Sequence, residues 1–520
     1  MKHPKLEKAL HWAVFALIAV QPLIDMDYLF YNVLDSMGLP RFSTVLRFVV
    51  LPLLVILTFV YREKHRKAVF IPAALYGLVL GSYFLLHHRQ AAMLADRILF
   101  TDNFIYSAYQ ELVYISTLVL PFAIVYIGYH DRFSRKDLRN AVLFESTVIS
   151  VPIVLGDLFV FGKSTYYGYT VANVFSWFTD IYEWYHPRTL ASKFFFNEGN
   201  TIGILMFMLL PLLYCFREEE EDPKMRRRIS LLILLQSMSM QVLATRVATY
   251  GAVVVPVLFL LIYFFAVFIM KERRFEKRAL VFPLVCTVLF ALMLDRTPAI
   301  QNQKVDAIND TALIHNPMGD VGREELKNAE DLVPGSKEWI DFYVYMFETY
   351  GINARYIQSV PSMYYTEYYS YQVDPKFWVD VTFMDVYDRV SGRQIERIFF
   401  NYKYQELSRR EKVLGMGYST FMNGSIVLEQ DFLQQIYTLG YAGFALCILP
   451  WFILILFGAA MCLKYFRRMF TMENISMMAA IGAAIGSAWL SGHVLDQFVT
   501  SVFMAFLAAV LLNRIREAKE

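Results

Sequence analysis

The sequence predicts an all-α, polytopic membrane protein with about twelve transmembrane helices and one large extracytoplasmic loop domain. Three observations carry this prediction. The 520 residues are 57% hydrophobic and only 18% charged, with a mean hydropathy of +0.39, which is too apolar for a water-soluble chain of any number of domains. Apolar stretches long enough to cross a bilayer recur along the chain. Basic residues gather in every second connection between these stretches.

A transmembrane helix needs about 20 predominantly apolar residues, and the candidate spans are taken in chain order. They are residues 8–24, 43–61, 68–86, 110–128, 141–161, 200–216, 229–246, 248–270, 279–295, 432–463, 475–491 and 496–513. The first stretch does not read as a cleavable signal peptide, because Gln21, Pro22 and Asp25 follow it without a small-residue cleavage site. We therefore expect it to remain as a span.

The charged residues test this map independently, because cytoplasmic connections collect Lys and Arg. With the N-terminus inside, the basic connections hold more than half of the 49 basic residues. They are residues 2–8, 62–67, 132–139, 217–228, 271–278, 464–468 and 514–519. The gap at residues 296–431 instead holds 14 basic and 20 acidic residues. We therefore expect a multi-pass protein of the cytoplasmic (plasma) membrane with both termini cytoplasmic, and no nucleic-acid partner.

The predicted organisation has three parts: helices 1–9 in residues 1–295, an extracytoplasmic loop domain at 296–431, and helices 10–12 in 432–520. All four cysteines fall in or beside predicted spans, so neither a disulfide framework nor a cysteine metal site is expected. The chain has no Walker loop and no GxGxxG, GxSxG or HExxH motif. We therefore expect no cofactor and no metal.

The long loop has three parts of different composition. Residues 301–335 predict irregular chain with a short helix near 323–331, and a tyrosine-rich block follows at 343–371. Tyrosine suits both a membrane-interface belt and a sugar-binding groove, so both readings stay open. Residues 385–412 are then charged and helix-like. The spacing of Arg389, Arg393 and Arg397 by four predicts one helical face, although Gly392 weakens the helix.

Several short runs resemble the O-antigen ligase and polymerase superfamily. They are Ser391-Gly392-Arg393, Leu414 to Tyr418, Leu428 to Leu433 running into Tyr437 to Phe444, Leu46-Arg47, Asn197 to Gly203, and Ala244 to Ala248. The resemblance covers most of the chain, but each run is short and degenerate. It implies a membrane glycosyltransferase, such as a polysaccharide polymerase or ligase of the Gram-positive type.

Members of that superfamily transfer a glycan from a polyprenyl-diphosphate carrier, such as undecaprenyl diphosphate, to an acceptor at the outer face of the membrane. The resemblance therefore implies a lipid-linked glycan donor, a polysaccharide or cell-envelope acceptor, and a bilayer around the spans. Such a reaction needs cations for the diphosphate, a base for the acceptor hydroxyl and a groove for sugars.

Arginine suits the diphosphate because its planar guanidinium binds phosphate through two hydrogen bonds. The candidate substrate-binding residues are Arg47, Arg188, Asn200, Arg246, Arg393 and His493. Arg47 and Arg246 lie at predicted outer ends of spans, where an arginine can also snorkel to the interface without binding anything. A surface salt bridge is the alternative for Arg393, and a polar helix-end turn is the alternative for His493.

The catalytic base is where the sequence departs from the ligases. Those proteins carry a histidine in a His-Asn-x-x-Leu run, and the matching run here is Glu429-Gln430-Asp431-Phe432-Leu433. Glu429 thus replaces the histidine, and Asp431 is the second candidate. A carboxylate can take a proton if it is ionised and close to the hydroxyl. The alternative is that both acids favour the dipole at a helix N-terminus. His315 reads as incidental.

Two function classes remain. A glycan polymerase or ligase would gather its charges at the outer face beside a folded loop, as this chain does. A non-enzymatic flippase for lipid-linked glycans would line a path through many spans with charges and would need little folded mass outside. The sequence favours the enzyme.

Overall fold

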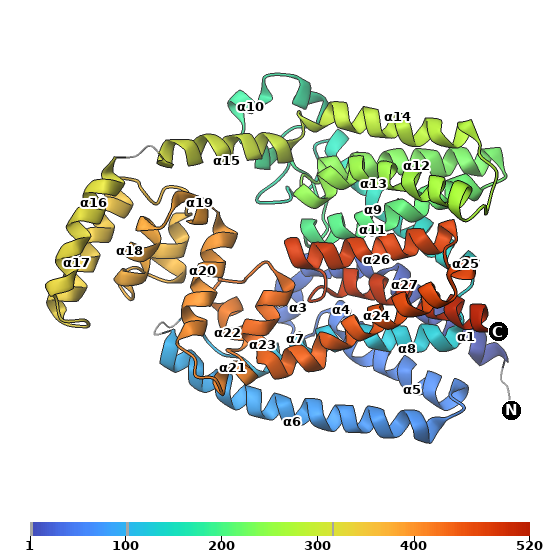
Figure 1. Ribbon diagram of the computed structural model, residues 1–520, viewed down its shortest axis with the longest axis horizontal. Coiled ribbons are helices and arrows are strands. Elements are labelled where there is room, and N and C mark those ends of the chain that lie inside the picture. Colours follow the sequence, from blue (N-terminus) through green and yellow to red (C-terminus); the bar gives the residue numbers. More distant parts are fainter. Residues whose placement is uncertain (1–3, 100–102, 315–316, 390) are drawn as a thin grey trace. The chain divides into compact units, whose positions relative to one another are not determined.

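The computed structural model describes residues 4–99, 103–314, 317–389 and 391–520, so His315 lies outside the described residues. Within those ranges the protein contains helices and no β-strand, which confirms the all-α class (Figure 1). The chain forms two compact units. The first consists of Met1–Ala73, Ser116–Asn302 and Pro450–Glu520, and the second of Ala74–Ile115 and Gln303–Leu449. The predicted division at 295/296 and 431/432 concerns sides of the membrane and stays a prediction.

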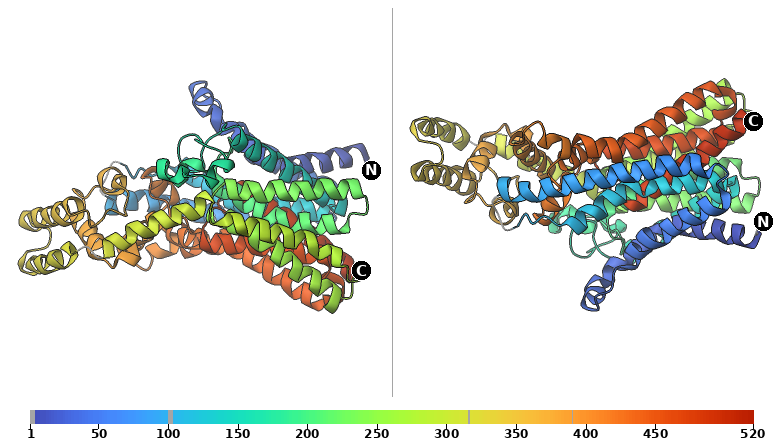
Figure 2. Two further views of the ribbon diagram at one scale, coloured as in Figure 1. Left: turned by 90° about the horizontal axis from the view of Figure 1, so that it is seen from above. Right: turned by 90° about the horizontal axis from the view of Figure 1, so that it is seen from below.

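The first unit contains most of the long helices. They are α1 (Pro4–Ala19), α2 (Gln21–Ile24), η1 (Asp25–Phe30), α3 (Tyr31–Ser36), α4 (Phe42–Val45), η2 (Leu46–Val50), α5 (Leu51–Arg62), α8 (Pro121–Asp131), α9 (Arg135–Leu158), η3 (Val174–Phe178), α10 (Ile181–Trp184), η4 (Pro187–Leu190), α11 (Gly199–Glu219), α12 (Pro223–Val242), α13 (Arg246–Phe264), η5 (Phe265–Ile269), α14 (Lys277–Leu294), α25 (Phe466–Met469), α26 (Met472–Leu490) and α27 (Phe498–Lys519). Figure 2 shows these long helices lying side by side, with η1 and α3 projecting from the bundle.

The second unit contains shorter helices. They are α16 (Met318–Leu326), η6 (Lys327–Asp331), α17 (Lys337–Met346), η7 (Phe347–Asn353), η8 (Tyr364–Tyr368), α18 (Pro375–Phe383), α19 (Val386–Arg389), α20 (Gly392–Gln405), α21 (Glu411–Leu414), α22 (Tyr418–Asn423) and α23 (Asp431–Cys447). Four helices belong partly to each unit: α6 (Arg66–Ile98), α7 (Ala108–Val119), α15 (Pro298–Ile314) and α24 (Leu449–Lys464).

Eight helical segments among the described residues are long and apolar enough to cross a membrane. They are Phe42–Arg62, Arg66–Ile98, Ala108–Asp131, Arg135–Leu158, Gly199–Glu219, Arg246–Ile269, Lys277–Ala307 and Phe498–Lys519. Two bent pairs, Lys5–Ala19 with Gln21–Ser36 and Asp431–Cys447 with Leu449–Lys464, raise the number to as many as ten. The predicted count of twelve is therefore not confirmed. The two other predicted spans, 229–246 and 475–491, fall largely within α12 and α26, which are helical but less apolar.

Helix α12 is less apolar because it begins with four basic residues and because polar side chains farther along it bond to the main chains of its neighbours. Gln236 Nε2 donates to Met206 O at 2.7 Å, and Gln241 Nε2 donates to Phe290 O at 2.8 Å. Ser239 Oγ donates to Ser150 O at 2.9 Å. Such interhelical hydrogen bonds hold helices together where lipid offers no polar partner. Helix α11, by contrast, is apolar on nearly every side and is almost wholly buried, as such helices are.

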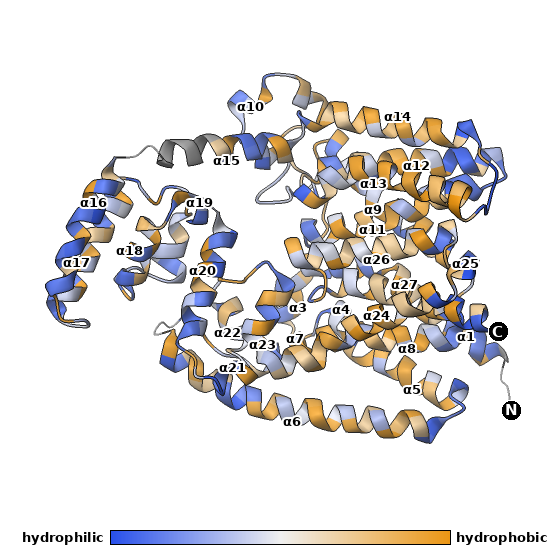
Figure 3. Ribbon diagram, in the orientation of Figure 1, coloured by the Kyte–Doolittle hydropathy of each residue, from blue (hydrophilic) through white to orange (hydrophobic). Residues whose placement is uncertain are grey.

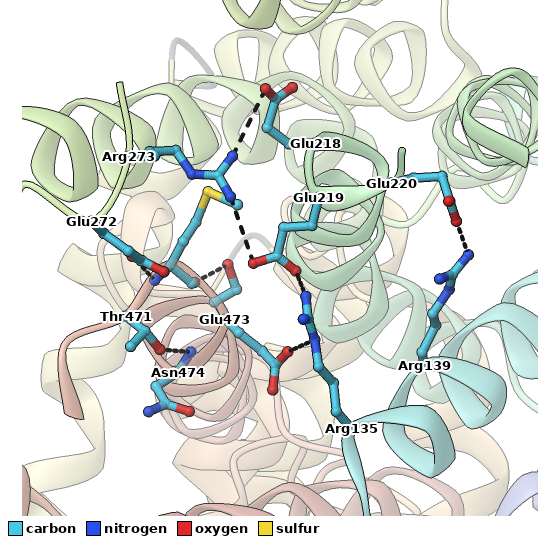
Figure 4. A network of polar contacts seen from close by, with 12 residues as sticks. Arg135, Arg139, Glu218, Glu219, Glu220, Glu272, Arg273, Thr471, Glu473 and Asn474 are labelled. Carbon is cyan, nitrogen blue, oxygen red and sulfur yellow. Dashed lines mark hydrogen bonds and ion pairs between the residues drawn. The ribbon is translucent and has the colours of Figure 1, made fainter. Parts of the chain in front are cut away.

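Charged residues gather at one end of the first unit (Figure 3). Figure 4 shows Arg135 of α9 between Glu219 of α11 and Glu473 of α26. Arg135 Nε lies 2.6 Å from Glu473 Oε2, and its Nη2 pairs with Glu219. Arg139 pairs with Glu220, and Arg273 Nη2 lies 3.8 Å from Glu219 Oε1. Several basic residues of these connections are thus paired with acids.

The other basic connections of the first unit belong to the same end. Arg62, at the end of α5, pairs with Asp131 at the end of α8 and donates to Glu7 O in α1 at 3.2 Å. The Arg516 guanidinium of α27 lies 4.7 Å from the centre of the Tyr129 ring of α8. The first described residues and the C-terminal helix end therefore share this end, as the alternating charges predict. The side of the membrane that it faces stays a prediction.

The second unit has a dense aromatic core, and this core takes most of the tyrosine block. Tyr343, Tyr350 and Tyr369 are buried with Phe377 and Trp378, and no more than 9% of any core side chain is exposed. Trp378 Nε1 donates to Tyr369 O at 2.7 Å. These tyrosines therefore pack a folded core, which is neither the interface belt nor the sugar groove that the sequence left open.

Two expectations for the long loop are wrong. Residues 301–335 are mostly helical, in α15, α16 and η6, and not irregular. Arg389, Arg393 and Arg397 do not share one helix face, because α19 ends at Arg389 and α20 begins at Gly392. Ser391 caps α20: its hydroxyl accepts the N–H of Gln394, and the Gln394 side chain accepts the N–H of Ser391. A Ser-x-x-Gln capping box starts a new helix at this point.

The paired charges of the first unit predict a stability difference between two acids that share one arginine. Glu473 Oε1 lies 3.0 Å from Arg514 Nη2 and its side chain is 9% exposed, whereas Glu517 Oε2 lies 3.3 Å from Arg514 Nη1 and is 62% exposed. We expect Glu473→Gln to lower the free energy of unfolding by about 1.5–3 kcal/mol, the scale of hydrogen bonds to charged groups. Glu517→Gln should change it little, because exposed pairs contribute little. Thermal unfolding of the detergent-solubilised protein measures both; equal effects would contradict the assignment.

Candidate functional site

The predicted site residues fall into two groups, one in each unit. Glu429, Asp431 and Arg393 belong to the second unit, and the other five predicted residues belong to the first. The prediction that Arg246 and Arg393 act on the same phosphates concerns both units and stays a prediction.

In the second unit, Arg393 and Glu429 are paired with each other. Arg393 is the second residue of α20, and Glu429 lies two residues before α23 begins. The guanidinium Nε of Arg393 donates to Glu429 Oε2. The side chains are 42% and 32% exposed, so solvent reaches both members of the pair. The proposed phosphate ligand and the proposed base therefore contact one another, although 36 residues separate them.

A tyrosine lies beside this pair. The Tyr364 hydroxyl donates to Glu396 Oε1 at 2.6 Å. Burial, together with the negative charges of Glu396 and Glu429, raises the pKa of Tyr364. The phenol therefore stays protonated and remains a hydrogen-bond donor. It also packs against the start of α20, because a Cβ on Gly392 would lie 3.3 Å from its hydroxyl oxygen.

Asp431 is placed differently from Glu429. It is the first residue of α23 and is only 1% exposed. A negative charge in the first turn of a helix is favoured by the helix dipole. Asp431 therefore occupies the helix N-terminal position that was the alternative to a catalytic role. Glu429 is the more accessible of the two acids.

Helix α23 is broken at Gly440, and the chain before α22 crosses it there. Gly440 has φ 68° and ψ 179° inside the helix, and Gly415 has φ 85°. Met416 N donates to Tyr437 O at 3.0 Å, and Gly417 N donates to Thr438 O at 2.8 Å. The two glycine-containing runs that resemble the family, 414–418 and 437–444, thus meet at this crossing.

The crossing admits only glycine at two positions. A Cβ on Gly415 would lie 2.3 Å from Thr438 O, and a Cβ on Gly440 would lie 2.4 Å from Val413 O. Both glycines also have a positive φ, which residues with a side chain rarely adopt. Close main-chain approach and backbone conformation therefore both require these glycines.

Four side chains of α6 and α7 bond to the main chain around the crossing, and sequence reasoning missed all of them. The Tyr83 hydroxyl donates to Leu439 O at 2.7 Å, and Gln90 Nε2 donates to Gly415 O at 2.9 Å. His87 contacts Leu414 O and Glu111, and Glu111 accepts the N–H groups of Tyr418 and Ser419. The available signal was ionisable residues inside apolar stretches, which are expensive in a membrane and usually functional.

In the first unit, Arg47 is held by an acid, an amide and an aromatic ring. Its Nη2 pairs with Asp25 and lies 3.4 Å from Gln21 Oε1. Its guanidinium carbon lies 4.7 Å from the centre of the Phe498 ring. The side chain is 13% exposed, so it packs inside the unit and does not extend freely to the interface.

His493 lies close to the start of α11. Its Nδ1 is 3.1 Å from Glu198 Oε1, and the Thr201 hydroxyl donates to Glu198 Oε2 at 3.0 Å. Asn200, the second residue of α11, is half-buried. Asp25, Glu198 and Thr201 line a small cleft of about 10 Å³, which is room for about one water molecule. A diphosphate does not fit in this cleft as it stands.

Arg188 and Arg246, the last two predicted site residues of the first unit, lie at the starts of η4 and α13. Arg188, in η4, donates from Nε to Asn302 Oδ1 at 3.1 Å, and its guanidinium carbon lies 5.5 Å from the centre of the Tyr166 ring. Arg246 is the first residue of α13 and is exposed.

Comparison with known proteins adds one finding. A family model described as O-antigen ligase like membrane protein matches residues 7–518 of the chain. No curated protein and no solved structure matches it.

The crossing predicts that Gly440 tolerates no side chain. We expect Gly440→Ala to reduce the yield of folded protein sharply, because a Cβ would meet main-chain atoms in a left-handed conformation that costs about 1–3 kcal/mol by itself. Gly81→Ala is the matched control, because a Cβ at that helical glycine meets nothing within 4 Å. Size-exclusion profiles and thermal unfolding of both variants, at equal expression, measure the difference. A Gly440→Ala protein as stable as the Gly81→Ala protein would rule out the crossing.

Proposed function

The chain belongs to the O-antigen ligase-like membrane protein family. From that premise we propose that it is a metal-independent glycosyltransferase that acts at the outer face of the cytoplasmic membrane. Its donor is a glycan linked to a polyprenyl diphosphate such as undecaprenyl diphosphate, and its acceptor is a growing polysaccharide or another cell-envelope polymer. The family supports membrane glycan transfer as such. The carrier, the acceptor and the choice between polymerase and ligase are proposals.

The proposed topology has twelve spans, both termini in the cytoplasm and residues 296–431 outside. The grouping of the basic connections at one end of the first unit supports it, because cytoplasmic connections are the basic ones. Helices α12 and α26 supply the two spans that are less apolar. Polar side chains are acceptable within them because they are buried against neighbouring helices.

The pairing of Arg393 with Glu429 is the observation that carries the proposed chemistry. Two groups with complementary tasks, a phosphate ligand and a proton acceptor, lie in contact and partly exposed. A diphosphate that binds the guanidinium competes with the Glu429 carboxylate for it. Donor binding would then leave Glu429 free to accept the proton of an incoming hydroxyl.

In the proposed reaction, the acceptor hydroxyl oxygen attacks the anomeric carbon of the donor sugar. A carbon–oxygen bond forms there, and the bond from the same carbon to the diphosphate oxygen breaks. The hydroxyl proton passes to Glu429, and the diphosphate leaves on the carrier with its added negative charge stabilised by arginine. Arg246 is the proposed second phosphate ligand, with Arg47, Arg188, Asn200 and His493 in supporting positions.

One assay separates the possible outcomes. Purified protein is incubated with a lipid-linked glycan, with and without a second acceptor. Longer glycan chains identify a polymerase, and transfer to the second acceptor identifies a ligase. Movement of the lipid-linked glycan across a vesicle bilayer without either product identifies the flippase.

The topology predicts the accessibility of single cysteines. Gln372→Cys and Glu221→Cys place thiols at exposed positions on opposite predicted sides, and the four native cysteines are buried and give little background. We expect an impermeant thiol reagent to label Gln372→Cys in intact cells and to label Glu221→Cys only after permeabilisation. The reverse pattern would overturn the orientation.

The base assignment predicts the behaviour of three variants. Glu429→Gln keeps the shape and removes the proton acceptor, so transfer should fall by about 10²–10⁴ while donor binding survives. Glu429→His should retain activity with its pH optimum moved toward about 6.5, the imidazole value. If Glu429→Gln stays active and Asp431→Asn is inactive, Asp431 is the base; if both stay active, neither is.

The same assay tests the arginines. Arg393→Lys and Arg246→Lys should not restore the loss seen with alanine, because an ammonium lacks the planar guanidinium. The expected loss is about 10²–10³ in rate, the scale for one electrostatic donor. Normal transfer by both alanine variants would exclude the diphosphate role.

A further inference from the structure

The second unit contains a fully buried, hydrogen-bonded pair of ionisable side chains that the proposed chemistry does not use. His87 of α6 and Glu111 of α7 are each 0% exposed, and His87 Nε2 lies 2.8 Å from Glu111 Oε1. Both residues belong to helical segments apolar enough to cross a membrane. Burying such polar groups is costly, and a well-packed apolar pair often gives equal or greater stability. Stability alone therefore does not explain this pair.

The contacts determine which groups of the pair donate. His87 Nδ1 lies 2.6 Å from Leu414 O, and Nε2 faces the Glu111 carboxylate. A carbonyl oxygen can only accept, so the Nδ1–H of His87 donates to Leu414 O. One proton then lies between His87 Nε2 and Glu111 Oε1 and joins the two side chains.

Glu111 extends the same chain of hydrogen bonds. Its Oε1 accepts the N–H of Tyr418 at 3.0 Å, and its Oε2 accepts the N–H of Ser419 at 2.8 Å. The pair thus binds a carbonyl at one end of segment 414–419 and two N–H groups at the other end. An apolar pair could not satisfy these main-chain groups, and each would be costly to leave unpaired in a buried position.

Aromatic contacts enclose this arrangement. The Tyr83 ring is stacked on His87 with centres 5.3 Å apart, and the Tyr114 ring is stacked on Tyr418 with centres 3.6 Å apart. Gln434 Nε2, in α23, donates to the Tyr114 hydroxyl at 3.0 Å. Segment 414–419 is therefore held from α6 and α7, with α23 bonded to the same tyrosine.

From this segment the chain leads directly to the proposed base. Helix α22 begins at Tyr418, and Phe421, Ile426 and Leu428 are each 1% exposed in the aromatic core of the second unit. The residue after Leu428 is Glu429. A shift of segment 414–419 is therefore carried along a tightly packed path to Glu429.

We propose that His87 and Glu111 form a hydrogen-bonded clamp that positions segment 414–419 and, through it, Glu429. They are positioning residues, because neither reaches the surface to touch a substrate. The proposal rests on the proposed function in so far as Glu429 is the acceptor-activating base.

The test uses the full-length protein with His87→Gln, Glu111→Gln and the double variant. Each glutamine keeps hydrogen-bonding capacity but removes the ionisable group. Tyr76→Phe is the matched control, because the Tyr76 hydroxyl of α6 donates to Leu446 O at 3.0 Å on the other side of Gly440. Hydrogen exchange of residues 411–424 reports the position of the segment without requiring activity. Transfer kinetics on a lipid-linked glycan give kcat and KM separately.

Each single variant should speed hydrogen exchange in 411–424 and leave α20 unchanged. It should lower kcat by about 10²-fold with little change in the donor KM, because a misplacement of about 1 Å has that effect. The double variant should be no worse than the more affected single one, because the two residues act as a unit. Tyr76→Phe should resemble the wild type in both measurements.

Two results would overturn the clamp. The first is unchanged exchange in 411–424 in both single variants, and the second is faster exchange with an unchanged kcat per folded molecule, which identifies a purely structural pair. A wild-type protein that transfers no glycan, or a fully active Glu429→Gln protein, instead counts against the proposed function. The exchange measurement still decides in those cases whether the pair holds the segment.

Discussion

A main-chain N–H or C=O that is shielded from water needs a partner from the protein, and the arrangement of the second unit follows from how that need is met where α23 breaks. The break at Gly440 exposes carbonyls that no helical turn can satisfy. The neighbouring run from Gly415 satisfies some of them with its own N–H groups, and side chains of α6 bond to others. Buried irregular chain is tolerated only when its main-chain groups are satisfied in this way. The polar side chains of α6 and α7 and the two glycines therefore belong to one hydrogen-bonded crossing.

The first unit differs, because it holds many charged residues at one end of an apolar helical bundle. Several of its arginines are paired with acids on other helices, and Arg135 pairs with acids of both α11 and α26. A positive charge at a connection thus directs insertion and later ties helices together. Arg47 meets the same requirement at its own position, through Asp25 and the Phe498 ring.

The sequence predicted those features that depend on local composition. Apolar length identified the helical class, and alternating basic connections identified residues that share one end of the first unit. The pattern predicted residues 229–246 and 475–491 as spans on equal terms with the others, but α12 and α26 are not among the eight segments that are long and apolar enough to cross a membrane. In α12, Gln236 and Gln241 lower the hydropathy, and their hydrogen bonds depend on the fold. The Ser391 capping box starts a new helix after Arg389, so the three arginines do not share the one helical face that their spacing predicted. A spacing of four residues carries no information about where a helix begins. For the tyrosine block, aromatic composition cannot distinguish a core from a surface.

For the candidate site, the resemblance brought Arg393 and Glu429 to notice separately, and only the fold places them in contact. His87 and Glu111 carried a readable signal, an ionisable residue in an apolar stretch, but no spacing could connect them to a segment more than 300 residues away. Long-range pairing of that kind is a property of the fold and not of any local pattern.

The glycine crossing has a consequence for how the family can diverge. A Cβ on Gly415 would collide with the main chain around Gly440, and a Cβ on Gly440 would collide with the main chain around Gly415. Neither position can therefore change alone without loss of the structure. The two positions should therefore be inherited together or lost together. A relative that lacks one glycine should have rebuilt this part of the molecule, including the polar residues at the positions of His87 and Glu111, and this pattern can be recognised in any sequence before a structure is known.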